Sequence, residues 1–116
     1  MWETYKKGFK AYLRLERSLS ENSIVAYLED VNKLTSYLES TGKAIPPEQV
    51  TTKNLEAFIK WIVEIGLAAY TQARIISGIK AFYKYLELED VITKDPTSLL
   101  EAPRLGRKTD FNNPFN

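Results

Sequence analysis

The sequence predicts an all-α protein with four main helices and a short fifth helix near its C-terminus. Three observations predict this class. Apolar residues recur at intervals of three and four in four separate segments, which is the spacing of one helix face. Apolar and polar residues nowhere alternate as in a half-buried β-strand. The chain has 116 residues, 44% of them hydrophobic, which is enough for one core and too short for two domains.

The first two predicted helices are recognised by their apolar faces. One spans about residues 2–17, and a row of cations on its other face is more often solvated surface than a binding site. The next begins near Ser20 and ends near Ser40, with Gly42 as its stop signal. Ser18 and Ser20 are both suitable N-caps for it, because a serine hydroxyl can accept a hydrogen bond from a free backbone N–H.

The third and fourth predicted helices are separated by a glycine. The third runs from Thr51 or Thr52 to Ile65, and Gly66 follows it in the position that commonly ends a helix. The fourth begins at Thr71, which is its expected N-cap.

A short fifth helix is expected to begin at Asp95 and Pro96, since Asp caps a helix and Pro is tolerated at its first position. Pro103 is expected to end it. The domain is thus expected to span residues 1–103. Residues 104–116 show no helical or strand period and are expected to form a disordered linker or a tail foreign to the domain.

The chain contains no histidine and no cysteine, and this excludes several classes of site. Neither a Ser-His-Asp triad nor a zinc site with His or Cys ligands can be built without them. The five glycines are isolated from one another, so there is no Gly-rich phosphate loop. We therefore expect no catalytic residue, no metal and no cofactor. No apolar run is long enough for a membrane span and no signal peptide is recognised, so a cytoplasmic protein is expected.

Residues 65–86 contain three cations and no Asp or Glu, although the formal net charge of the chain is only +1. Wound as a helix from Thr71, this stretch sorts into two faces at about 100° per residue. One arc of about 120° holds the apolar residues that face the core. The other arc holds cations and small residues, with Gly78 at its edge: Arg74, Ser77, Lys80, Ala81 and Lys84. A face with cations and no acid suits a polyanion such as nucleic acid.

Four short motifs occur in order. Ser20, Ser23, Tyr27 and Asp30 follow the pattern S-x-x-T…Y…D, and residues 71–86 follow T-x-x-R-x-x-S-x-[IL]-[RK]-x-F-[YF]-x-[YF]-L. Asp-Pro at 95–96 and Ala-Pro-Arg at 102–104 follow in turn. Over about residues 1–105, the chain resembles the N-terminal core-binding domain of tyrosine recombinases of the phage-integrase family, particularly its Xer-like branch. The resemblance implies a small orthogonal, SAM-like helical bundle.

The resemblance also implies a function and its residues. The second and fourth helices would approach the major groove of double-stranded DNA at a recombination half-site. The residues that it places at the DNA are Ser23, Ala26, Thr71, Arg74, Ser77, Gly78, Lys80 and Lys84. Glu29, on the same face, departs from the expected character because an acid repels phosphate. Strand cleavage would belong to a C-terminal catalytic domain, which with other recombinase protomers would be a partner, and this chain would not itself be an enzyme.

Other interpretations stay open. Arg74 could pair with an acid of the second or third helix, and the small residues Ser77 and Gly78 could serve close helix packing. Lys80 and Lys84 could be ordinary solvated lysines. Two other functions also fit the chain: a helical protein-interaction module, and a helix-turn-helix regulator formed by the third and fourth helices. The lack of acids on the fourth helix favours DNA over a protein partner.

Overall fold

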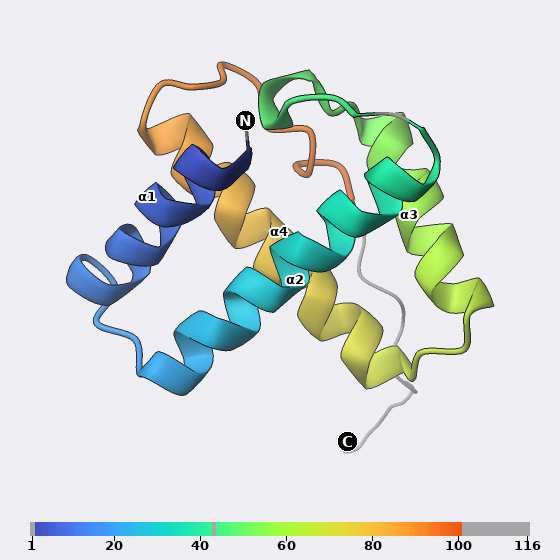
Figure 1. Ribbon diagram of the computed structural model, residues 1–116, viewed down its shortest axis with the longest axis horizontal. Helices are drawn as coiled ribbons and strands as arrows, with labels where there is room; N and C mark the ends of the chain where they lie inside the picture. The colour runs from blue at the N-terminus through green and yellow to red at the C-terminus, as the bar shows by residue number, and fades with distance from the viewer. Residues whose placement is uncertain (1, 43, 101–116) are drawn as a thin grey trace.

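The computed structural model describes residues 2–42 and 44–100 (Figure 1). These residues form four α-helices and one short 3-10 helix, with no β-strand among them, so the all-α class is confirmed. In chain order the elements are α1 (Trp2–Leu15), α2 (Glu21–Ser40), η1 (Pro47–Gln49), α3 (Thr52–Glu64) and α4 (Ala69–Leu88). None of these helices is long and apolar enough to cross a membrane.

The bundle is organised around the crossing of α2 and α4. The two helices cross near the centre of the molecule, with α1 beside one end of the crossing and α3 beside the other (Figure 1). The contact between α2 and α4 is the most extensive between any two helices. Helix α1 packs against both of them, and α3 packs against α4. The crossing gives the small bundle its orthogonal form.

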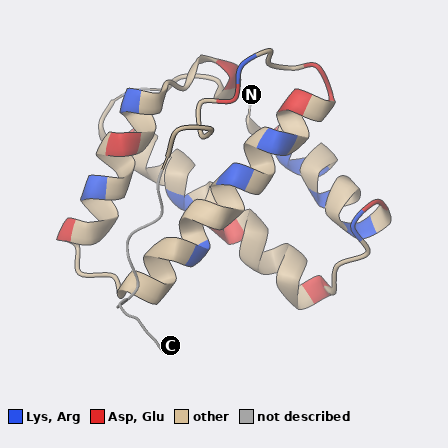
Figure 2. Cartoon of the chain, turned by 180° about the vertical axis from the view of Figure 1, so that it is seen from behind, with Lys and Arg blue, Asp and Glu red and all other residues tan. Residues whose placement is uncertain are grey.

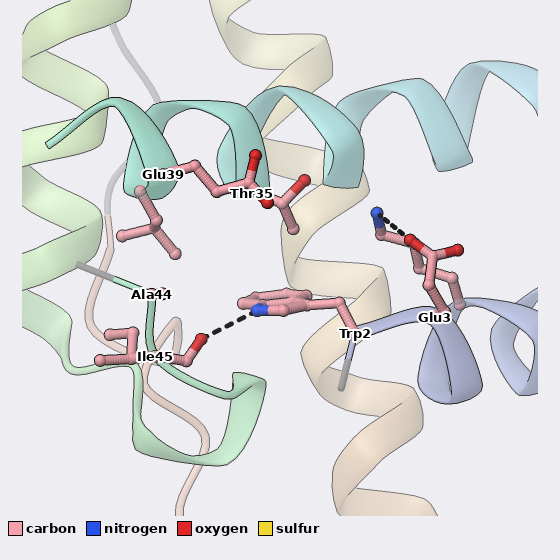
Figure 3. Close-up of a pocket in the computed structure, with 8 residues that line it drawn as sticks. Trp2, Glu3, Thr35, Glu39, Ala44 and Ile45 are labelled. Atoms are coloured by element: carbon pink, nitrogen blue, oxygen red, sulfur yellow. Dashed lines mark hydrogen bonds and ion pairs between the residues drawn. The ribbon is translucent and has the colours of Figure 1, made fainter. Parts of the chain in front are cut away.

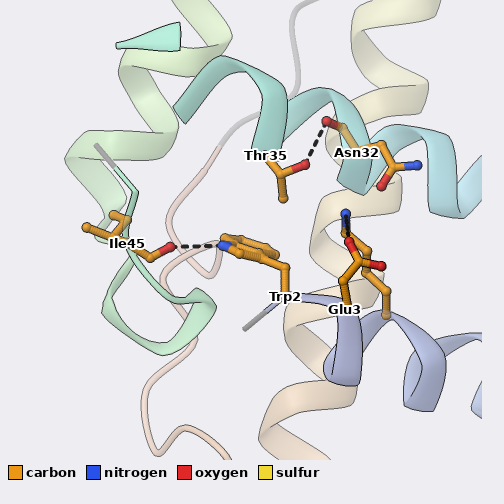
Figure 4. A network of polar contacts seen from close by, with 6 residues as sticks. Trp2, Glu3, Asn32, Thr35 and Ile45 are labelled. Carbon is orange, nitrogen blue, oxygen red and sulfur yellow. Dashed lines mark hydrogen bonds and ion pairs between the residues drawn. The ribbon is translucent and has the colours of Figure 1, made fainter. Parts of the chain in front are cut away.

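An aromatic cluster joins α1 to α4 in the core. Phe9 and Phe82 are fully buried and meet edge to face, with ring centroids 5.3 Å apart. Trp2 stacks on Phe82 with centroids 5.8 Å apart, and its Nε1 donates a hydrogen bond of 2.9 Å to the Ile45 carbonyl, as Figure 3 and Figure 4 show. Such aromatic pairs add about 0.5–1.5 kcal/mol beyond burial. The indole therefore ties the start of α1 both to α4 and to the loop that follows α2.

The N-caps of α2 and α3 agree with the sequence. Ser20 caps α2, because its hydroxyl accepts a hydrogen bond of 3.2 Å from the Ser23 N–H. Ser18 has a left-handed backbone with φ of 53° and is not the cap. Thr51 caps α3 in a reciprocal capping box with Asn54, with bonds of 3.1 and 2.9 Å. Each cap satisfies N–H groups that a helix start leaves unpaired.

The two predicted glycine stops are confirmed. Gly42 and Gly66 have φ values of 77° and 90°, which side chains with a Cβ rarely adopt. After α3, Gly66 donates to the Val63 carbonyl and Leu67 donates to the Ile62 carbonyl, at 3.0 and 3.3 Å. This is the pair of bonds of a Schellman motif, which ends α3 and leads the chain directly toward α4.

The predicted start of α4 is wrong by two residues. The helix begins at Ala69, and Thr71 lies inside its first turn instead of capping it. The Ala68 carbonyl accepts the first helical hydrogen bond, 2.9 Å from the Gln72 N–H. The Gln72 side-chain amide also donates a hydrogen bond of 2.7 Å to the Leu67 carbonyl. No side chain caps this helix start, and the glutamine amide instead ties the first turn of α4 to the loop before it.

The short fifth helix expected from Asp95 is also absent from the described residues, where residues 96–99 form turns. Asp95 Oδ1 accepts hydrogen bonds from the N–H and the hydroxyl of Thr97, at 2.8 and 2.6 Å. Asp95 therefore closes a local turn, a common alternative to helix capping for this residue type. The expected helix end at Pro103 and the expected linker at 104–116 lie outside the described residues.

Two distant side chains hold this turn segment in place. Thr52 Oγ1, at the start of α3, donates 2.8 Å to the Pro96 carbonyl. Lys80 Nζ, on α4, donates 2.9 Å to the Leu100 carbonyl. These two bonds hold the turn segment against α3 and α4.

Gly78 allows the close approach of α2 and α4. It is buried, and a Cβ added to it would lie 2.8 Å from Asp30 Cβ and 2.9 Å from Asp30 Cγ. Real Cβ atoms essentially never approach other atoms so closely. The crossing therefore requires glycine at this position because of the space beside it, and its backbone conformation is ordinary helix.

We expect Gly78→Ala to destabilise the protein. Overpacking costs about 1–3 kcal/mol and outweighs the gain of up to about 1 kcal/mol from alanine's better helix propensity. Urea unfolding should show a free energy of unfolding lower by about 1–2 kcal/mol. Ser77→Ala, at the exposed neighbouring position, is the control and should change stability by no more than about 0.5 kcal/mol. A Gly78→Ala variant as stable as the parent chain would contradict the tight crossing.

Candidate nucleic-acid interface

One side of α4 is free of the core. Its exposed or partly exposed residues follow one another at intervals of three and four: Tyr70, Arg74, Ser77, Ala81, Lys84 and Leu88. Figure 2 shows the Lys and Arg positions spaced along α4 and the acidic positions gathered toward its C-terminal end. This stripe shares Arg74, Ser77, Ala81 and Lys84 with the outer face expected from the sequence, and it lies beside α2 at the crossing.

An ion pair stands at the centre of this face. Arg74 NH1 lies 2.9 Å from Asp30 Oδ1 of α2. The two partners differ greatly in exposure, at 44% of the Arg74 side chain and 3% of the Asp30 side chain. Among the described residues, Asp30 Oδ1 has no partner in hydrogen-bond geometry. The contact with Arg74 is therefore an ion pair whose N–H does not point along the line to the oxygen. The guanidinium covers a buried carboxylate and keeps its outer surface toward solvent.

Burial governs the ionisation of Asp30. Loss of hydration raises the pKa of its carboxyl from the ordinary 3.8 to about 6. The positive charge of Arg74 opposes this rise, and Lys33 does so more weakly, while Glu29 adds to it. The pKa of Asp30 therefore lies well above that of an exposed Asp even with an arginine beside it.

Four of the predicted site residues line one shallow hollow of about 210 Å³ between α2 and α4. They are Ser23, Ala26, Arg74 and Ser77. Tyr27 and Asp30 complete the lining. The small side chains from both helices leave room beside the guanidinium, so an outside group can approach it from this side.

A second hollow, of about 510 Å³, lies on the other side of the ion pair. Thr71 and Arg74 from α4 line it, together with polar residues of α2 that include Glu29, Asn32, Lys33 and Ser36. Arg74 thus borders both hollows, and Thr71 joins the site through the second one.

The N-terminus of α2 opens beside the first hollow. Ser23 is exposed there, and the hydroxyl of Ser20 donates 3.1 Å to the Ser23 hydroxyl. Helix N-termini attract anions through their free N–H groups. Glu21, in the same turn, is paired with Arg14 through two hydrogen bonds of 2.9 and 2.8 Å, and this pairing lowers its pKa. The arginine thereby offsets a charge that would otherwise repel an anion.

The remaining predicted residues lie in different settings. Lys84 is exposed on the stripe, with a loose contact of 3.8 Å to Glu87. Lys80 is partly buried by its bond to Leu100, away from the Arg74 side of α4. Gly78 is buried against Asp30, which is the close helix packing considered as its alternative role.

The structure adds residues of α2 that the predicted site did not include. Asp30 and Lys33 line the hollows beside Arg74. The spacing from Ser23 to Ala26 continues at helical intervals to Asp30 and Lys33, so periodicity alone could have extended the predicted site along α2. Tyr27, the tyrosine of the S-x-x-T…Y…D motif, has a core contact and a surface contact: it meets Phe9 edge to face with ring centroids 6.3 Å apart and also borders the first hollow.

No group of three acidic, His or Cys side chains in the described part of the chain could hold a metal ion. The site therefore offers a guanidinium, hydroxyls and a helix N-terminus. These groups recognise anions and planar acceptors such as phosphates and base edges.

Comparison with known proteins gives a consistent result. A family model described as "Phage integrase, N-terminal SAM-like domain" matches residues 7–90. The tyrosine recombinase XerD of Chlorobaculum tepidum is 35% identical over 106 residues, which cover 91% of this chain and 34% of the relative. XerD of Rhizobium meliloti is 30% identical over 92% of this chain and 34% of the relative, and XerC of Herpetosiphon aurantiacus is 35% identical over 85% and 32%. The chain thus spans about a third of the length of these curated relatives. No solved structure matches it.

The raised pKa of Asp30 predicts a pH-dependent stability. Between the unfolded pKa near 3.8 and the folded pKa of about 6, the folded chain binds more protons than the unfolded chain. The contribution of this carboxyl to the free energy of unfolding must therefore fall as pH rises through that window. Unfolding in urea from pH 4 to 7.5 measures it, with Asp30→Asn as a variant that does not titrate there. Relative to Asp30→Asn, the parent chain should lose up to roughly 3 kcal/mol between pH 4 and pH 7 and then level off. A difference that is constant or rises with pH would refute the assigned burial.

Proposed function

This chain belongs to the phage-integrase family, in its Xer-like tyrosine recombinase branch, and we propose that its α2–α4 face binds double-stranded DNA at a recombination half-site. One observation carries the proposal. Residues predicted from the sequence to touch DNA lie together around Arg74, on two helices and beside two hollows: Ser23, Ala26, Thr71, Arg74 and Ser77.

Each group in this face has a role that suits DNA. The exposed N-terminus of α2 with Ser23 would receive a phosphate, since free N–H groups and a hydroxyl donate to phosphate oxygens. Lys84 would contact the backbone further along α4. Arg74 would make the contact of highest specificity, because a guanidinium can bind the O6 and N7 atoms of guanine in the major groove. The small Ala26 and Ser77 side chains would let the groove approach.

We propose a division of labour with the rest of the recombinase. This domain would position the DNA and would not catalyse, while a C-terminal catalytic domain and other protomers carry out cleavage and strand exchange. The relatives support this, since they are named tyrosine recombinases and the chain corresponds to about a third of their length. Because it would act on DNA together with the catalytic domain and the other protomers, we propose that the domain works in the cytoplasm.

Protein docking is the second candidate function, and one observation favours it. Leu15 and Leu88 are 74% and 57% exposed and border a hollow of about 600 Å³ between α1 and α4, with Tyr12 and Tyr85 in its wall. Exposed apolar patches of this kind often bind other proteins. This hollow lies apart from Arg74, so Leu15→Ser should leave DNA binding unchanged if the two functions are separate.

We expect Arg74→Ala to weaken DNA binding and to relax its sequence preference. A base contact of this type is worth about 1–3 kcal/mol. We would measure affinity by fluorescence titration with two duplexes. One is a duplex that the parent chain selects from a randomised pool, and the other is a scrambled duplex of the same composition. Arg74→Lys is the control, because it keeps the charge for phosphate and loses the two-pronged contact. Binding by Arg74→Ala that equals the parent affinity for both duplexes at low salt would refute the assigned role.

Lys84 and Lys80 provide a matched pair for the phosphate contacts. Each phosphate contact contributes about 0.9 to the slope of log K against log salt concentration. Lys84→Ala should therefore lower the slope by about 0.9, and Lys80→Ala should lower it less, because the Lys80 ammonium is held at the Leu100 carbonyl and is less exposed than Lys84. Titrations over a salt series measure both. Equal slopes for the two variants would remove Lys84 from the interface.

A further inference from the structure

Asp30 is an unusual residue to find under a DNA-binding face. A carboxylate repels phosphate, and this one is 3% exposed in a position where burial disfavours its charged form. A buried ion pair is weak evidence for added stability, since apolar replacements are often neutral or stabilising. Asp30 therefore calls for an explanation other than stability.

The Asp30 carboxylate is enclosed by residues of both α2 and α4. Helix α2 supplies Asp30 at the crossing, and α4 supplies a glycine whose missing side chain is the space that the carboxyl group fills. Any larger residue than glycine at position 78 would displace Asp30. The acid and the glycine thus form one arrangement, which places a negative charge directly beneath the guanidinium of Arg74.

The ion pair with Asp30 leaves part of the Arg74 guanidinium free to contact an outside acceptor. NH1 lies 2.9 Å from Asp30 Oδ1, while the side chain remains 44% exposed between the two hollows. A guanidinium has five N–H donors, so one contact with Asp30 leaves others for an outside acceptor. A free arginine samples many rotamers, and ordering it before binding reduces the entropic cost of each hydrogen bond that it then makes.

We propose that Asp30 is a positioning residue for Arg74, holding the guanidinium in place so that it discriminates between DNA sequences. The proposal rests on the proposed DNA binding and goes beyond it, because it assigns a role in specificity to an acid that lowers affinity by its charge. Asp30 itself does not touch DNA.

The charge and the positioning role predict opposite effects, and this makes the inference testable. As an acid near phosphates, Asp30 lowers affinity for any duplex, so Asp30→Asn should strengthen binding to a scrambled duplex. As a positioning residue, Asp30 supports sequence preference, so the same variant should lower the ratio of affinities for the selected and scrambled duplexes. Glu29→Gln is the matched control: it removes the same charge from the adjacent, exposed position on α2. It should strengthen binding to both duplexes equally and leave the ratio unchanged.

The experiment is a double-mutant cycle on the 116-residue chain. Affinities are measured for the parent chain, Asp30→Asn, Arg74→Ala and the double variant, each with the selected and the scrambled duplex, and thermal unfolding checks that each variant is folded. We expect each single variant to lower the affinity ratio about tenfold and the double variant to lower it no further than Arg74→Ala alone. An unchanged ratio in Asp30→Asn would overturn the positioning role and leave DNA binding standing. A further loss in the Arg74→Ala background would also overturn it, because Asp30 would then act without Arg74. A parent chain that binds neither duplex would overturn the proposed function and this inference together.

A second measurement needs no variant. NMR relaxation of arginine Nε–Hε groups in the free chain reports how ordered each side chain is. Arg74 should be ordered, with S² of about 0.8, whereas the exposed Arg17 should be below about 0.6. Equal mobility of the two arginines would refute positioning before DNA binds.

Discussion

The rest of the structure depends on the close crossing of α2 and α4 at Gly78. Because no side chain separates the two helices there, Asp30 of α2 reaches the surface of α4 and lies beneath Arg74. The same approach brings the N-terminal half of α2 alongside the outer face of α4, so that one hollow has walls from both helices. A wider crossing would separate these walls. The packing of the core and the geometry of the candidate DNA surface therefore share one constraint.

The composition of α4 follows from its central position. It is packed by α1, α2 and α3, and nine of its residues are buried, from Gln72 to Leu86. The side of the helix left to solvent includes Arg74, Lys84 and the small residues Ser77 and Ala81. A helix that contributes so much to the core can bind a ligand only along that side. This explains why the candidate site needs a second helix, α2, to complete it.

Local signals allowed most of the fold to be predicted, and long-range contacts explain the errors. The ends of α2 and α3 depend on caps and glycines within a few residues, such as Ser20 and Gly66, and the sequence analysis identified both. The turns after Asp95 combine the local bonds between Asp95 and Thr97 with a bond from Thr52, 44 residues away from its acceptor, and no local pattern contains that second contact. The same distinction applies to the site. Periodicity identifies Ser77 as an outward-facing residue and the family resemblance adds Ser23, but only the crossing shows that Asp30 is buried beneath Arg74.

The engagement of Lys80 limits how tightly this face can hold DNA. Its ammonium donates to the Leu100 carbonyl and anchors the turn segment to α4, so it is held at that segment. Of the three cations in residues 65–86, Arg74 and Lys84 are exposed. The positive charge of Arg74 is partly offset by the carboxylate of Asp30 beside it. A protein that makes about 6–10 phosphate contacts loses about 10³–10⁵-fold in affinity between 50 and 200 mM salt, so such contacts supply much of its binding. On the proposed function, a face with so few cations would act mainly by orienting DNA, and the greater part of the affinity would come from other parts of a recombinase assembly.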